Sequence, residues 1–140
     1  MILGDFIRHA NEMSDESESP ETITGFLNDG LAKINAECKA AYPFMNPVDL
    51  EAQIPIPETW VRVMLLPFAA GRIKTKDSSQ FEYSDLYAEF QRGLEIFKSN
   101  YTIPEDLRDR SGQVFDPITG QWVSNASDIY SVRPMGWMGW

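Results

Sequence analysis

The chain has 140 residues, 43% hydrophobic and 24% charged, and its 21 acidic side chains outnumber 12 basic ones to give a formal net charge of −9. This length suits one small domain with appendages and excludes a multidomain enzyme. The acidic balance argues against sequence-specific DNA binding, because such proteins use clustered Lys and Arg to neutralise phosphates.

Residues that usually carry chemistry are scarce. The chain has one cysteine, Cys38, and one histidine, His9, so neither an internal disulfide nor a Cys/His zinc site is expected. We interpret Cys38 as an inert thiol on an apolar helix face and His9 as a surface side chain. Because the sequence also lacks a phosphate-binding loop and a nucleophile motif, we expect no enzymatic activity, no cofactor and no metal.

The N-terminus has no basic segment followed by an apolar run, and nowhere do about 18 apolar residues occur in succession. We therefore expect an intracellular protein with no membrane contact.

Residues 1–19 are predicted to form an N-terminal arm. Ile2, Leu3, Phe6 and Ile7 have helical spacing, but the segment is too short to be stable alone and must dock on other parts of the protein. Acidic residues and serines alternate over residues 12–21, which are predicted to be a solvated linker.

Residues 20–99 are predicted to form an all-α core, a small bundle of three helices. The first begins at Ser19-Pro20 and should end near Ala41. The second begins after Pro57 and should kink near Pro67, because an internal proline removes a backbone donor and clashes with the preceding turn. A polar connection over residues 74–80 leads to the third, which begins after Ser84 and runs to about Ser99.

Each predicted helix has one apolar face that should form the core. In chain order these faces are Ile23, Phe26, Leu27, Leu31, Ile34 and Cys38; Trp60, Val61, Met64, Leu65, Phe68, Ala69 and Ile73; and Tyr83, Leu86, Tyr87, Phe90, Leu94 and Phe97. Because these faces close within residues 23–97, the sequence predicts that residues 100–140 are dispensable for folding.

Residues 100–140 are predicted to be an extended, aromatic-rich C-terminal arm. Val114-Phe115 and Trp122-Val123 flank the turn signal Asp116-Pro117-Ile118-Thr119-Gly120, which indicates a small β-hairpin. The tryptophans either complete a thin core or anchor the chain to another protein, and we favour the second because Trp and Tyr are enriched at interface hot spots. The expected partner-binding residues are Phe115, Trp122, Tyr130, Arg133, Trp137 and Trp140.

Arg72, Lys74 and Lys76 form a basic cluster at the end of the second predicted helix. The favoured interpretation is that these cations complement the helix dipole. The alternative is that they form a rim facing a DNA channel or an acidic neighbouring subunit.

The segment Ile54-Pro55-Ile56-Pro57-Glu58-Thr59, followed by an apolar helix, a polar link and Tyr83-Ser84-Asp85-Leu86-Tyr87-Ala88-Glu89-Phe90, resembles the head-tail connector (adaptor) family of tailed bacteriophages. The resemblance covers about residues 20–99. It implies a small helical protein of the virion, assembled in the host cytoplasm, that forms a homo-oligomeric ring beneath the portal protein, dodecameric on the family's pattern. It further implies that a tail or stopper protein docks below the ring and that contact with the packaged DNA is transient and non-specific.

Two other classes of function stay open. The chain could be a small acidic regulator that binds a host protein, although five of its acids are concentrated in one linker rather than spread over a surface. A hydrolase using Asp85 and Glu89 is disfavoured, because a four-residue spacing suits any exposed helix face.

Overall fold

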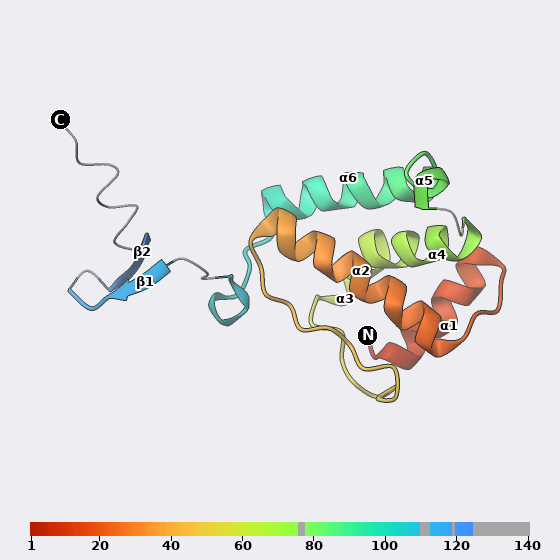
Figure 1. Ribbon diagram of the computed structural model, residues 1–140, viewed down its shortest axis with the longest axis horizontal. Coiled ribbons are helices and arrows are strands. Elements are labelled where there is room, and N and C mark those ends of the chain that lie inside the picture. The colour runs from red at the N-terminus through yellow and green to blue at the C-terminus, as the bar shows by residue number, and fades with distance from the viewer. Residues whose placement is uncertain (76–77, 110–112, 119, 125–140) are drawn as a thin grey trace. The chain divides into compact units, whose positions relative to one another are not determined.

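Figure 1 shows a computed structural model of the protein, which describes residues 1–75, 78–109, 113–118 and 120–124. The chain divides into two compact units, Met1–Arg108 and Asp109–Trp140. The first unit contains α1 (Leu3–Ser14), α2 (Pro20–Cys38), α3 (Glu58–Trp60), the π-helix η1 (Val61–Leu65), α4 (Leu66–Lys74), α5 (Ser78–Phe81), α6 (Asp85–Asn100) and the 3-10 helix η2 (Glu105–Leu107). The second contains the strands β1 (Gln113–Asp116) and β2 (Gln121–Ser124). The predicted all-α bundle is confirmed.

Helix α4 occupies the middle of the bundle and packs against α1, α2 and α6. Every residue from Leu66 to Gly71 is buried, as the wide apolar face of this segment predicts. The largest fully buried side chains around it include Phe6, Phe68, Phe90 and Phe97.

The N-terminal segment docks, as predicted, but it does so inside the bundle. Leu3, Phe6 and Ala10 of α1 are fully buried, and α1 packs against α4. Its first turn is fixed to the loop between α2 and α3, because the Gly4 N–H donates to the Leu50 carbonyl at 2.9 Å. Helix α1 is thus a fourth core helix, and it extends through Met13, so the segment between α1 and α2 is shorter than the predicted linker.

Two of the predicted helix starts are confirmed by side-chain caps, and α3 begins after Pro57 without one. The Ser19 hydroxyl accepts from the Thr22 N–H at 3.2 Å, and the Ser84 hydroxyl accepts from the Tyr87 N–H at 3.2 Å. Helix α2 ends at Cys38, a little before the predicted end, because Lys39 adopts a left-handed conformation with φ of 52°.

Where the sequence predicts a kink near Pro67, the structure has one π-helical turn, η1, which ends two residues before the proline. Pro67 has no N–H, so the α-helical bond from residue 67 to the Val63 carbonyl cannot form. The Leu66 N–H instead donates five residues back, to the Val61 carbonyl. The helical backbone therefore continues through Pro67 into the rest of α4.

The connection between α4 and α6 differs from the prediction. Part of the predicted polar link is helix α5, whose Phe81 is buried with its ring centroid 5.1 Å from that of Phe68. Tyr83 was expected in the core but is 91% exposed. It lies before the cap Ser84, where the helical period of α6 does not yet apply.

The second unit contains the predicted hairpin. Strands β1 and β2 pair antiparallel, with Phe115 opposite Trp122 and Val114 opposite Val123 in the backbone register. Gly120 has a φ of 72°, which glycine adopts without steric cost in such a turn.

Candidate functional site

An apolar groove lies on the surface of the helical unit, where residues of α1, α3, η1 and α6 come together. Its volume is about 520 Å³, and it is lined by Met13, Thr59, Trp60, Arg62, Val63, Pro67, Glu89, Arg92, Gly93 and Ile96. Three of its large apolar side chains are exposed to solvent, Met13 by 42%, Val63 by 44% and Ile96 by 47%. Apolar side chains gathered around one hollow are typical of a surface that binds another molecule.

The groove depends on a close approach between α6 and the π-helical turn. A Cβ atom placed on Gly93 would lie 2.9 Å from the Val63 carbonyl oxygen and 2.8 Å from the Met64 Cγ atom. Both distances are too short for any residue other than glycine, so Gly93 lets α6 lie directly against the backbone of η1. The same π turn carries Val63 and Arg62, which line the groove.

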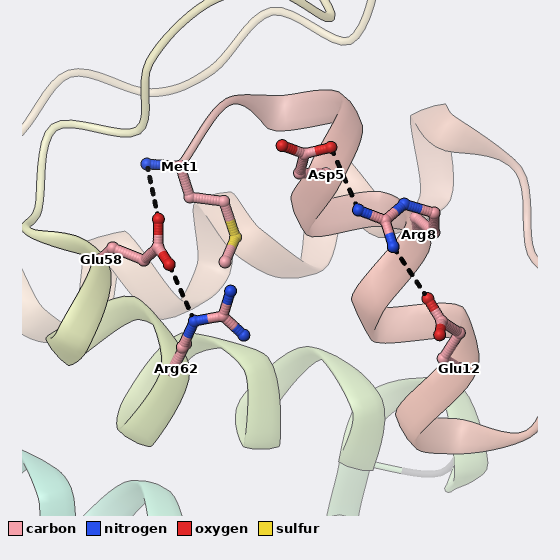
Figure 2. Close-up of polar contacts among 6 residues, drawn as sticks. All are labelled: Met1, Asp5, Arg8, Glu12, Glu58 and Arg62. Carbon is pink, nitrogen blue, oxygen red and sulfur yellow. Dashed lines mark hydrogen bonds and ion pairs between the residues drawn. The ribbon is translucent and has the colours of Figure 1, made fainter.

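The charged side chains in and near the groove differ in the ion pairs that they form. Figure 2 shows the Glu58 carboxylate between the Arg62 side chain and the Met1 amino group. The Arg62 Nε donates to a Glu58 oxygen at 3.0 Å, and the other Glu58 oxygen lies 3.9 Å from the Met1 nitrogen. On α1, Arg8 bridges Asp5 and Glu12 at 3.3 Å each (Figure 2).

Arg92, by contrast, forms no ion pair with any residue that the structure describes. Its guanidinium is an exposed donor beside an apolar surface. Arginine is enriched at protein interfaces, where its planar guanidinium can accept a carboxylate partner.

A smaller cavity of about 270 Å³ lies at the end of α2 and is lined by Cys38, Phe97, Tyr101 and Ile103 among others. Burial raises the pKa of the Cys38 thiol, an effect that nearby Lys98 partly offsets. A raised pKa keeps the thiol protonated and less nucleophilic, which agrees with its interpretation as inert. Burial likewise raises the pKa of the Tyr42 hydroxyl.

Two residues of the predicted basic cluster, Arg72 and Lys74, lie in the last turn of α4, where cations complement the helix dipole. Arg72 donates to Asp29 of α2 at 3.2 Å, and its guanidinium carbon lies 4.7 Å from the centroid of the Phe26 ring. Arg72 therefore ties α4 to α2. Lys74 is exposed, and Lys76 lies outside the described residues.

The structure brings together two of the predicted partner-binding residues, Phe115 and Trp122, as opposite positions of the hairpin backbone. Tyr130, Arg133, Trp137 and Trp140 lie outside the described residues.

Sequence reasoning missed the groove. Val63 and Ile96 do not belong to the apolar faces predicted for their helices, and neither was considered as a site residue. One signal was available in the sequence. Both residues are large and apolar but lie off the buried face of an amphipathic helix, so formation of the core does not explain why they are apolar.

Among the described residues, no group of three or more His, Cys, Asp or Glu side chains could hold a metal ion. None of the helices described there is long and apolar enough to cross a membrane. Comparisons of the chain with protein-family models, with curated proteins and with solved structures found no match.

Proposed function

We propose that this protein is a structural subunit, the head-tail connector (adaptor) of a tailed bacteriophage. In this role, copies form a ring beneath the portal that joins the DNA-filled head to the tail and surrounds the DNA channel. Its work is to hold other proteins in place, and it catalyses no reaction.

The observation that carries this proposal is the exposed apolar groove on an otherwise well-packed helical body. Met13, Val63 and Ile96 remain 42% to 47% exposed, although the same body buries 25 apolar residues in its core. Leaving such surface in water is unfavourable, and a partner that covers it gains roughly 25 cal/mol for each Å². An assembly subunit has this kind of surface, because its stable state is the assembled one.

A second line of support is the division of the chain into two units. The helical unit ends at Arg108, and the residues beyond it carry three of the four tryptophans. A compact body followed by an aromatic-rich extension matches the core-and-arm organisation that the resemblance implies. The arm would bind the portal or a neighbouring subunit, with a tail or stopper protein below the ring.

The electrostatics also suit a DNA channel. With a net charge of −9, the protein should repel packaged DNA on average and make only transient, non-specific contact with it. A ring that DNA must cross without being retained needs a surface of this sign.

The experiment that tests the proposal is the mass and symmetry of the assembly, measured by native mass spectrometry and electron microscopy, alone and with a portal protein. We expect a closed ring with a single number of subunits, at least when the portal is present. A single copy bound to a host protein, with no ring under either condition, would support the acidic regulator instead.

A further inference from the structure

We infer that the groove of one copy receives the loop of residues 44–51 from a neighbouring copy, so that copies associate head to tail. This inference rests on the proposed function, because it names the contact by which a ring of this chain would form.

The loop between α2 and α3 carries the second exposed apolar surface of the helical unit. Phe44 is 61% exposed, Val48 is 80% exposed and Leu50 is 42% exposed. Two exposed acids, Asp49 and Glu51, alternate with them in the sequence. The loop thus presents apolar side chains and carboxylates together.

This loop is held in shape by the helices behind it. The Asn28 side chain donates to the Met45 carbonyl at 3.0 Å and accepts from the Met45 N–H at 2.8 Å. At the other end, the Leu50 carbonyl accepts from the Gly4 N–H at 2.9 Å. A loop fixed in this way loses little conformational entropy when it binds, which favours its use as an interface element.

No residue of the loop lines the groove of its own chain. Leu50 is anchored beside Gly4 in the first turn of α1, whereas Met13, which lines the groove, lies nine residues farther along the same helix. At 1.5 Å per residue this separation is roughly 14 Å along the helix axis. The exposed apolar side chains of the loop are therefore available to another molecule.

The two surfaces are complementary in polarity and in charge. The groove offers Met13, Val63 and Ile96. Its Arg62 is paired with Glu58, so Arg92, which has no ion pair with any described residue, is the cation available to a partner. The loop offers apolar side chains with Asp49 and Glu51. On a chain with a net charge of −9, most pairs of surfaces repel, so Arg92 facing the carboxylates of the loop favours this pairing.

Because the groove and the loop are different surfaces of one molecule, their contact is heterologous. A repeated heterologous contact gives a closed ring when its rotation closes and an open filament when it does not. The contact therefore generates the architecture that the proposed function requires.

Cross-linking between two single-cysteine variants tests this contact in the full-length protein. Both variants carry Cys38→Ser; one adds Val48→Cys on the loop, and the other adds Ile96→Cys in the groove. After mixing and treatment with a short bis-maleimide cross-linker, we expect a covalent dimer that contains one copy of each variant. The matched control replaces Val48→Cys with Tyr83→Cys, which is at least as exposed but lies outside both surfaces.

Charge reversal provides a second readout. Arg92→Glu alone and Glu51→Arg alone should each weaken self-association about tenfold or more, and the two changes combined should restore much of it. Sedimentation velocity measures all three variants.

The outcomes separate the two proposals. If the wild-type protein forms rings but the loop and groove cysteines cross-link no more than the control, the loop contact is wrong and the ring function stands. If the wild-type protein never assembles, with or without a portal protein, both proposals fail.

Discussion

The segment from Glu58 to Lys74 has an inner and an outer side, and the two are packed differently. On the inner side, Met64, Leu65 and Phe68 are fully buried between the neighbouring helices. On the outer side, Val63 of the same π turn is 44% exposed. Val63 is apolar like the inner residues, although it lies beside exposed Arg62. Hydrophobicity alone therefore does not distinguish a residue that stabilises the fold from one that is available to a partner.

Glycine accounts for part of this difference. A Cβ atom on Gly30 would lie 2.9 Å from the Leu65 side chain, and one on Gly93 would lie 2.8 Å from that of Met64. These glycines let α2 and α6 close tightly over the inner side. Substitutions on the two sides should therefore affect different properties: inner changes should reduce stability, and outer changes should reduce assembly.

The largest expected effect is on the inner side. Phe68 is fully buried, and its ring centroid lies 5.1 Å from that of Phe81 and 4.9 Å from that of Phe90. Phe68→Ala should lower the free energy of unfolding by about 3 to 5 kcal/mol, measured by urea denaturation. Ile96→Ala in the groove, which the outer side also lines, is the control and should cost about 1 kcal/mol or less. Similar losses of unfolding free energy for Phe68→Ala and Ile96→Ala would show that the two positions do not differ in their contribution to stability.

A second prediction concerns where the helical unit ends. The sequence suggested that everything after Ser99 is dispensable for folding, but Tyr101 stacks on Phe97 with ring centroids 4.8 Å apart, and the Leu107 carbonyl accepts from the Ala41 N–H. Truncation after Ser99 should therefore lower the free energy of unfolding by on the order of 2 to 4 kcal/mol.

Truncation after Arg108 is the matched comparison and should leave the cooperative thermal transition of the helical unit unchanged. Circular dichroism measures both variants. Equal stability of the two truncated proteins would mean that residues 100–108 add nothing to the core.

A third prediction uses two glycines with opposite surroundings. Gly93→Ala should destabilise the protein by about 1 to 3 kcal/mol, because the added methyl group meets the Val63 carbonyl. Gly25→Ala on α2 meets nothing within 4 Å and should stabilise it by up to about 1 kcal/mol through helix propensity. Thermal melts of the pair measure the difference, and a stabilising Gly93→Ala would contradict the close approach.

The smallest expected effect is a dependence on pH. Burial raises the pKa of Tyr42 above its ordinary value of 10.0, so the folded state keeps the phenolic proton at a pH where the unfolded state loses it. This contribution to stability is complete below pH 10 and is lost as the pH rises beyond it. Tyr42→Phe should therefore show a smaller fall in the free energy of unfolding between pH 9 and pH 11. An identical alkaline profile would show that Tyr42 ionises equally in both states.

Local signals explain what the sequence could predict about the fold. Ser19, Ser84 and Pro67 act on backbone groups within a few residues of themselves, so helix starts and the irregular turn were predictable. The burial of α1 and of Phe81 depends on which helices meet in space, and helical periodicity carries no such information. Tyr83 was wrongly assigned to the core because the helical period was extended past the cap at Ser84, to a position before the helix begins.

The groove was less predictable than the fold because three separated segments build it. Met13, Val63 and Ile96 come together only after α1, η1 and α6 have packed, and that packing requires a glycine at position 93. The sequence did show that Val63 and Ile96 are apolar residues off the predicted core faces. This position indicates that the two residues lie on the surface, but it does not show that they line one groove together with Met13.

The most direct test of the account is Ile96→Glu, with monomer stability and assembly mass measured on the same sample. Glutamate suits a helix, so the melting temperature of the monomer should stay within a few degrees of the wild-type value. Its carboxylate should repel Asp49 and Glu51 of the neighbouring loop, so the ring should be lost, whereas Ile96→Lys should retain more assembly. Rings that form normally from Ile96→Glu, or a monomer that it unfolds, would contradict the claim that the groove serves assembly and the buried side of Glu58–Lys74 serves the fold.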